Sequence, residues 1–185
     1  MKVLLVRHGE TDWNVASRIQ GMTDTDLNEK GIEQARELGR SLITYPGNIC
    51  RIYTSPLKRA RQTADILSEY IGVSCEVLEG IEEMNFGIFE GISWKEAKVK
   101  HEDAYAKWHR NRRYTKIPEG ESYQDVYERV SAAIEKITEN ETGEVLVITH
   151  SGVIKTLLSG IYNTPFQEMA TRYVTENCKI VPLEV

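Results

Sequence analysis

The sequence of 185 residues is poor in the features that mark secreted and membrane-bound proteins. Its three cysteines, Cys50, Cys75 and Cys178, are far apart and form no C-x-x-C pair, so neither a disulfide framework nor a zinc site is predicted. No apolar stretch approaches the roughly 20 residues that span a bilayer, and the N-terminus has no signal-length apolar region. We therefore expect a soluble, cytoplasmic protein with no membrane partner.

Positive charge is also scarce. The formal net charge is −5, whereas a general nucleic-acid binder needs a dominant positive field, so no nucleic-acid partner is expected. The G-x-x-x-x-G-K-[ST] loop of nucleoside triphosphate sites and the H-E-x-x-H zinc pattern are both missing, and we expect no metal and no cofactor. The sequence contains no repeat or linker, and nothing in it indicates an oligomeric state.

What remains is ordinary globular composition, with 41% hydrophobic and 28% charged residues. A chain of this length forms one domain with a sizeable core, so we assign residues 1–185 to a single domain. Short β-type runs alternate with amphipathic helices, which predicts a three-layer α/β fold. The continuous apolar run at residues 3–6 is typical of a strand covered on both faces. Residues from about 80 to 122 interrupt the alternation, and we expect them to form a lid over the site.

Capping residues before runs of helical spacing predict the starts of four helices, at Asn28, Ser55, Ser93 and Ser122. The first is expected to reach about Tyr45, and the last is expected to reach about Asn140. One helix after Ser93 is expected to carry three aromatic residues, which either line the lid or belong to the core: Trp94, Tyr105 and Trp108.

Three strand-to-helix junctions carry side chains suited to chemistry. His8 ends the first apolar run, His150 ends a second at residues 145–148, and Arg59 lies in a KRAR string that opens a helix. Right-handed crossovers bring the carboxyl ends of successive parallel strands to one edge of a sheet. We therefore expect these three residues to face one pocket, although each taken alone is equally typical of a structural or surface position.

A phosphate group is the ligand that suits such an edge. The first turn of a helix presents unpaired N–H groups and the positive end of its dipole. Arg7 and Arg59 can add bidentate hydrogen bonds of the kind that guanidinium makes to phosphate oxygens. Lys58 and Arg61 are further candidates on the same helix as Arg59.

Six strings support a family resemblance and together cover nearly the whole chain: LVRHGETDWN, RIQGMTDTDLNEKGIEQA, YTSPLKRARQTA, EEMNFGIFEG, PEGES and VITHSG. In this order they resemble the histidine phosphatase superfamily, which includes cofactor-dependent phosphoglycerate mutase. The resemblance implies a mixed, mostly parallel six-stranded sheet with the active site at its carboxyl edge. It also implies that His8 is the nucleophile, that Arg7 binds the transferred phosphoryl group, and that Glu83, rather than its neighbour Glu82, transfers the proton.

The residues support this chemistry independently. A neutral imidazole can attack phosphorus, which would give a phosphohistidine and split one displacement into two. Arg7, Arg59 and His150 can stabilise the charge of the phosphoryl oxygens without a metal. Further candidate substrate-binding residues are Asn14, Gln20, Gly21 and Ser151. The serine stands where many family members have glycine, and its hydroxyl either contacts substrate or fills space. Glu121 and Ser122 of PEGES either cap a helix or touch ligand.

Several functions are compatible with this residue set. A phosphatase acting on a small phosphorylated metabolite is the leading hypothesis, because the family's mutases usually carry longer insertions and tails. A mutase would return the phosphoryl group to a second hydroxyl of the same substrate. It is favoured if the basic cluster docks a second anionic group, although such a cluster is equally typical of a solvated helix end: Arg110, Arg112, Arg113 and Lys116. An inert phosphoester-binding module is disfavoured, since binding alone has no need of an acid such as Glu83.

Overall fold

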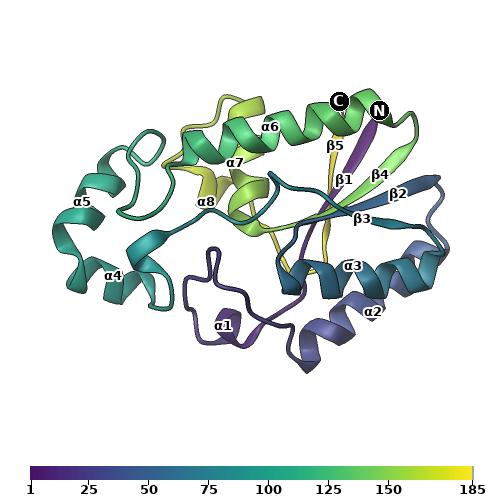
Figure 1. Ribbon diagram of the computed structural model, residues 1–185, viewed down its shortest axis with the longest axis horizontal. Coiled ribbons are helices and arrows are strands. Elements are labelled where there is room, and N and C mark those ends of the chain that lie inside the picture. Colours follow the sequence, from purple (N-terminus) through teal and green to yellow (C-terminus); the bar gives the residue numbers. More distant parts are fainter. Residues whose placement is uncertain (185) are drawn as a thin grey trace.

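The computed structural model describes residues 1–184 and contains a five-stranded sheet with helices on both faces (Figure 1). The strands are β1 (Lys2–Arg7), β2 (Ile49–Thr54), β3 (Cys75–Val77), β4 (Glu144–Thr149) and β5 (Ile180–Glu184). Their order in the sheet is β3-β2-β4-β1-β5. All neighbouring pairs are parallel except β1 and β5, which are antiparallel. The mixed, mostly parallel α/β fold is therefore confirmed.

The strand count differs from the prediction, since the described residues form five strands rather than six. Residues 78–93, which follow β3, form no strand. Gly80, Gly87 and Gly91 have positive φ values of 95°, 48° and 81°, in a region that favours glycine and interrupts extended chain. The only regular element that this glycine-rich stretch forms is a short 3₁₀ helix, η1 (Gly87–Phe89).

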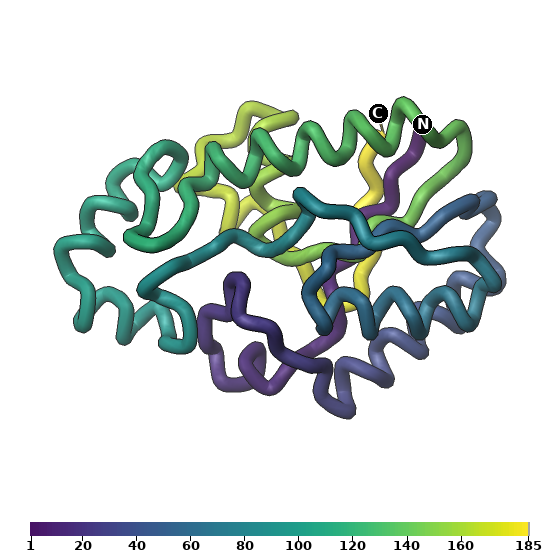
Figure 2. The backbone as a smooth tube through the Cα atoms, in the orientation of Figure 1, coloured from purple at the N-terminus to yellow at the C-terminus, as the bar shows by residue number. Residues whose placement is uncertain are grey.

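The sheet divides the interior into two hydrophobic cores. The helical layers are α2 (Glu29–Ile43) with α3 (Lys58–Ile71), and α6 (Tyr123–Asn140) with α7 (Ser151–Ile161). Val3 and Leu5 of β1 pack in the core beneath α6 and α7, whereas Leu4 and Val6 pack against α2 and α3. This burial on both faces explains the continuous apolar run of the first strand. Figure 2 shows the two helical layers on opposite sides of the sheet.

Three of the four predicted caps are confirmed. Asn28 accepts a hydrogen bond from the Gly31 N–H at the start of α2, and both Ser93 and Ser122 form capping boxes. The prediction for Ser55 is wrong, because α3 begins later, after Leu57, without a side-chain cap. The Ser55 hydroxyl lies 2.8 Å from a histidine ring and accepts a longer hydrogen bond of 3.4 Å from the Leu57 N–H.

The later part of the 80–122 segment extends beyond the sheet, where Figure 1 shows it on the left. It contains two helices, α4 (Trp94–Lys100) and α5 (Glu102–Arg110), in place of the single helix that was predicted. The break falls at His101, whose backbone (φ −130°, ψ 48°) is not helical. Two short helices complete the set, α1 (Asp12–Val15) and α8 (Met169–Arg172). Within residues 1–184, no helix combines the length and the apolar character needed to cross a bilayer.

Candidate active site

The three junctions meet at one cavity of about 400 Å³. Its wall includes eight of the nine predicted site residues: Arg7, His8, Asn14, Gln20, Gly21, Arg59, Glu83 and Ser151. The ninth, His150, is fully buried, and its ring centroid lies 5.2 Å from that of His8. Side chains from both halves of the sequence are thus gathered where β1, β2 and β4 end.

The hydrogen-bond partners of His8 determine which ring nitrogen carries the proton. Nδ1 lies 2.7 Å from the carbonyl oxygen of Gly9, which can only accept, so Nδ1 must be the protonated nitrogen. Nε2 lies 3.3 Å from Nε of Arg59, which can only donate. The lone pair therefore resides on Nε2, and this nitrogen faces the guanidinium group that is placed to bind an anion.

Both histidines of the site are held in the neutral form. Burial, followed by the charges of Arg59 and Arg7, holds the pKa of His8 well below its usual value. Burial is also the main cause of the strongly lowered pKa of His150, and the charge of Arg59 is the second largest cause. Nε2 of His150 lies 2.8 Å from the Ser55 hydroxyl, while its buried Nδ1 has no hydrogen-bond partner among residues 1–184.

The peptide bond that follows His8 is held at both ends by side chains from distant parts of the chain. The Gly9 N–H donates to the Thr63 hydroxyl at 3.0 Å, and the His8 carbonyl accepts from the Asn177 amide at 2.7 Å. The Thr63 hydroxyl in turn donates to the Arg59 carbonyl at 2.8 Å. Sequence analysis missed both holding residues, because neither a threonine in a helix nor an asparagine before a strand has a functional signature of its own.

Arg59 is completely buried, and its guanidinium is oriented by backbone carbonyls. The two terminal nitrogens donate to the carbonyls of Gly21 at 2.8 Å and Thr23 at 2.9 Å. Gly21 has φ +54°, and a Cβ there would lie 1.9 Å from a carboxylate oxygen of Glu90. The contact that the structure shows for Gly21 is thus an orienting one, made through its carbonyl to Arg59.

Asn14 and Gln20 each use the side-chain oxygen within the protein. Oδ1 of Asn14 accepts from the Thr11 N–H at 3.1 Å, and Oε1 of Gln20 accepts from the hydroxyls of Thr11 at 2.9 Å and Thr25 at 2.7 Å. The amide nitrogen is therefore the atom through which each side chain can donate to an anion in the cavity.

Arg7 and Ser151 both contact Thr175, which precedes β5. Arg7 Nη1 donates to the Thr175 carbonyl at 2.9 Å, and the Ser151 hydroxyl lies 2.6 Å from the Thr175 hydroxyl. Nε of Arg7 is buried and has no partner within the described residues. One end of the guanidinium is thus anchored, and the remaining N–H groups are left for a ligand.

The carboxyl group of Glu83 enters the same cavity. Its oxygens accept from the Met84 N–H at 2.9 Å and from the Gly152 N–H at 3.1 Å. A Cβ at position 152 would lie 2.4 Å from Oε1, so only glycine leaves room for this carboxyl. Glu82 is turned elsewhere, because it accepts from the Gly80 N–H at 2.8 Å and lies 3.5 Å from Arg129. The geometry thus distinguishes the two neighbouring glutamates.

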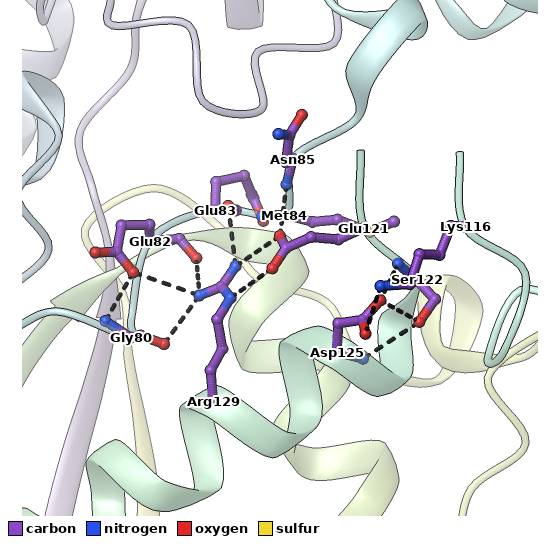
Figure 3. A network of polar contacts seen from close by, with 10 residues as sticks. All are labelled: Gly80, Glu82, Glu83, Met84, Asn85, Lys116, Glu121, Ser122, Asp125 and Arg129. Atoms are coloured by element: carbon purple, nitrogen blue, oxygen red, sulfur yellow. Dashed lines mark hydrogen bonds and ion pairs between the residues drawn. The ribbon is translucent and has the colours of Figure 1, made fainter. Parts of the chain in front are cut away.

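Arg129 of α6 anchors the loop that carries Glu83, and sequence analysis missed it (Figure 3). Its guanidinium donates to the carbonyls of three loop residues, Gly80, Glu82 and Glu83. It also pairs with both carboxylate oxygens of Glu121. Periodicity did not reveal this role, since an arginine on an amphipathic helix is more often simply solvated.

The two PEGES residues have structural roles in α6 and in the loop. Glu121 is the carboxylate partner of Arg129, and Ser122 closes a capping box with Asp125 at the start of α6.

The rest of the cavity wall is rich in aromatic and basic side chains. Its wall includes Phe86, Trp94, Tyr105, Trp108, Arg112, Tyr123 and Lys155. The indoles of Trp94 and Trp108 stack with their centroids 5.2 Å apart, and the Arg112 guanidinium lies 4.7 Å from the Trp108 ring. The predicted alternatives of lining and core both apply to Trp108, which is buried in the core, and to Tyr105, which is partly buried against it. Trp94 lines the cavity but is 39% exposed and lies outside the core.

Only Arg112 of the predicted basic cluster lines the cavity. Arg113 donates to Gln124 at 2.8 Å, Lys116 pairs with Asp125 at 3.0 Å, and Arg110 is exposed.

Two donors of these lining side chains have no hydrogen-bond partner among the described residues. Nε1 of Trp108 and Nε of Arg112 are both buried and unpaired within residues 1–184. Burial lowers the pKa of Lys155, and the charge of Arg7 lowers it further. Among the described residues, no group of three or more His, Cys, Asp or Glu side chains is arranged to hold a metal ion. The cavity wall therefore carries basic and donor groups in addition to Arg7, His8 and Arg59.

Comparison with known proteins gives a consistent result. Residues 3–185 match the model of the histidine phosphatase superfamily (branch 1). The metal-independent phosphoserine phosphatase of Arabidopsis thaliana is 37% identical over 163 residues, which are 84% of this chain and 66% of that protein. Phosphoglycerate mutase-like protein 4 of the same plant is 37% identical over 160 residues, 84% of this chain and 69% of that protein. The chain thus spans about two thirds of the length of these relatives.

A solved structure supports the same relationship. A phosphoserine phosphatase variant from Entamoeba histolytica, bound to phosphoserine, superposes with a TM-score of 0.82 and 28% sequence identity. The match covers 98% of this chain and 89% of that structure.

Proposed function

Because the chain belongs to the histidine phosphatase superfamily (branch 1), we propose that it hydrolyses small phosphomonoesters through a phosphohistidine intermediate on His8, with no metal and no cofactor. The observation that carries this proposal is the 3.3 Å contact between Arg59 Nε and His8 Nε2. It combines an unprotonated nucleophilic nitrogen with a cationic donor aimed at the same point. A phosphoryl group bound there would meet both.

The first half-reaction follows from this arrangement. The Nε2 lone pair of His8 attacks phosphorus while the bond from phosphorus to the ester oxygen breaks. Arg7, Arg59 and His150 stabilise the charge on the phosphoryl oxygens. Glu83 gives its proton to the departing oxygen, so the alcohol leaves neutral.

The second half-reaction regenerates the enzyme. Glu83, now a carboxylate, takes a proton from a water molecule as the water oxygen attacks the phosphohistidine. The bond from nitrogen to phosphorus breaks, inorganic phosphate is released, and His8 recovers its neutral ring. Glu83 is again protonated, so protons balance over the cycle.

The 80–122 segment acts as a lid over the organic part of the substrate. It contributes the aromatic side chains and Arg112 to the cavity wall. The unpaired N–H groups of Trp108 and Arg112, together with Lys155, favour a substrate whose organic part carries a carboxylate or a similar acceptor. Phosphorylated hydroxy acids and amino acids have this chemistry, which agrees with the phosphoserine in the related structure.

A panel of esters tests the proposal. With a chelator present, we expect release of inorganic phosphate from phosphoserine, 3-phosphoglycerate, glycerol phosphate and p-nitrophenyl phosphate. Phosphoserine and 3-phosphoglycerate, which carry a carboxylate, should have the highest kcat/KM. Arg112→Met should reduce kcat/KM for phosphoserine more than for p-nitrophenyl phosphate. Activity that is lost on chelation and restored by one divalent ion would overturn the metal-independent mechanism.

The same panel tests the mutase alternative, which the name of one relative keeps open. Isomerisation of 3-phosphoglycerate faster than its hydrolysis would establish a mutase in place of a phosphatase.

A further inference from the structure

We propose that Arg129 is a positioning residue for proton transfer, because it fixes the 80–85 loop so that the Glu83 carboxyl meets the leaving oxygen. This inference rests on the proposed role of Glu83 as the acid. Arg129 does not line the cavity and touches no site side chain that would contact a substrate. Its charge contributes to the lowered pKa of His150, and its hydrogen bonds act on Glu83 through the backbone that it holds.

The contacts of Arg129 concentrate on one short stretch of backbone. Nη1 donates to the Gly80 carbonyl at 2.9 Å and to the Glu82 carbonyl at 2.8 Å, while Nη2 donates to the Glu83 carbonyl at 3.1 Å. Figure 3 shows the guanidinium surrounded by these oxygens. One side chain thus fixes the peptide units on either side of Glu83's own position in the loop.

Glu121 holds the guanidinium in turn and also secures the far end of the loop. Its Oε1 accepts from Arg129 Nε at 2.9 Å, and its Oε2 accepts from Nη2 at 3.1 Å. Oε2 further accepts from the Asn85 N–H at 2.8 Å, and the Glu121 N–H donates to the Asn85 carbonyl at 2.9 Å. Arg129 and Glu121 together therefore anchor the loop at both ends.

The Glu83 carboxyl is sensitive to this anchoring because its two partners belong to different elements. The Met84 N–H moves with the loop, whereas the Gly152 N–H belongs to α7 beside the histidines. A displaced loop would separate the carboxyl from Gly152, and with it from the phosphoryl site. Small displacements of a positioned catalytic group are costly to rate.

Lysine can reproduce only some of the hydrogen bonds that the arginine makes in this network. A guanidinium offers five N–H donors in a planar fork, which matches three carbonyls and one bidentate carboxylate. An ammonium group has three donors around a single nitrogen. We therefore expect Arg129→Lys to retain part of the anchoring and Arg129→Met to lose it.

The test uses the dependence of rate on the leaving group. An alkyl phosphate such as glycerol phosphate needs a proton on its leaving oxygen, whereas p-nitrophenyl phosphate hardly does. We expect Arg129→Met to lower kcat/KM for the alkyl ester roughly ten- to hundredfold, part of the full effect of a general acid, with a several-fold smaller loss for the aryl ester. Arg129→Lys and Glu121→Gln should show weaker losses of the same selectivity. Arg129→Met combined with Glu83→Gln should be no more selective than Glu83→Gln alone.

Arg51→Met is the matched control, because Arg51 forms an ion pair of 2.6 Å with Glu141 and lies outside the cavity wall. It should leave the ratio of alkyl to aryl rates unchanged. The inference about Arg129 is overturned if Arg129→Met, Arg129→Lys and Glu121→Gln lose kcat/KM equally for both esters while Glu83→Gln loses it mainly for the alkyl ester. In that case the role of Glu83 as the acid still stands. If Glu83→Gln also loses both activities equally, the assignment of the acid is wrong and the inference falls with it. Circular dichroism and the urea unfolding midpoint report, independently of activity, whether each variant is folded.

Discussion

Nε of Arg59 lies 3.3 Å from Nε2 of His8, in a contact to which only the arginine can bring the proton. The guanidinium of the same arginine is fixed from behind by the carbonyls of Gly21 and Thr23. The lone pair of His8 Nε2 and the N–H of Arg59 Nε thus already face each other in the absence of a ligand. An anion that binds between them exchanges this contact for a bond to each partner.

The first prediction concerns the site of the covalent intermediate. Quenching turnover should trap a phosphoryl group on His8, because its Nε2 is unprotonated and beside Arg59. The adduct should be labile in acid and stable in base, as a phosphoramidate is and a phosphoserine is not. Mass spectrometry of the quenched enzyme gives the position. A label on His150 or Ser151, or an adduct that persists in His8→Ala, would show that the nucleophile is wrongly assigned.

The second prediction concerns Thr63, which links the peptide after His8 to the Arg59 carbonyl. Thr63→Val keeps the shape but leaves the Gly9 N–H buried without its acceptor, at a cost of about 1–3 kcal/mol of stability. We expect kcat/KM to fall roughly tenfold, equally for alkyl and aryl esters, because nucleophile placement affects both. Thr63→Ser restores the hydroxyl and should recover most of the activity.

The control for Thr63 is Thr156→Val. The Thr156 hydroxyl is also buried but has no hydrogen-bond partner within residues 1–184, so its removal should change the rate little. If Thr63→Ser is as impaired as Thr63→Val, the hydroxyl is not what matters and packing explains the effect.

The third prediction concerns Gly152. A Cβ there would lie 2.4 Å from Glu83 Oε1, so Gly152→Ala should displace the carboxyl while the fold remains intact. Because the proposed acid moves and the nucleophile does not, alkyl esters should lose far more activity than aryl esters. In the matched control Gly143→Ala, the new Cβ would lie 2.9 Å from the Cys50 sulfur, outside the cavity wall. Activity of Gly152→Ala with unaltered selectivity would show that Glu83 does not act at this position.

The sequence was informative wherever a local rule decides the outcome. The unbroken apolar run at residues 3–6 indicated a strand buried on both faces, and Asn28, Ser93 and Ser122 marked helix starts because capping depends on neighbours within three residues. The convergence of His8 with Arg59 followed from topology, since parallel strands end at one edge. The fold class and the location of a site at that edge were predictable for this reason.

The sequence was less informative where a residue far away in the chain determines the role of a side chain. Ser55 matched the pattern of a cap, yet its shorter contact, of 2.8 Å, is with the ring of His150, 95 positions later, and α3 begins after Leu57. The loop is anchored by Arg129 because α6 packs against it, and the Gly9 N–H reaches the Thr63 hydroxyl because α3 packs beside the end of β1. No rule of residue spacing predicts such contacts. For the same reason, the sequence did not reveal that Arg112 is the one member of its basic cluster that lines the cavity.

The last prediction concerns stability at mildly acidic pH. In the folded protein, burial and the charge of Arg59 hold the pKa values of His8 and His150 well below normal, whereas in the unfolded chain both return to about 6.5. Below pH 6.5 the unfolded state therefore binds more protons than the folded state. The free energy of unfolding should fall by about 1.4 kcal/mol per pH unit for each histidine, until the pH reaches the folded-state pKa.

Urea unfolding followed between pH 8 and pH 5 measures this slope. Depressed carboxyl groups such as Glu10 and Glu141, with reference values of 4.5, act mainly below this window, so it isolates the histidines. His150→Gln removes one titrating group. It should therefore reduce the slope of the free energy of unfolding against pH by up to about 1.4 kcal/mol per pH unit, whatever it does to the stability at pH 8. A slope in His150→Gln equal to that of the parent protein would show that His150 is not held neutral by burial. The lone pair inferred for His8, which is buried in the same environment, would then need direct measurement by its imidazole chemical shifts.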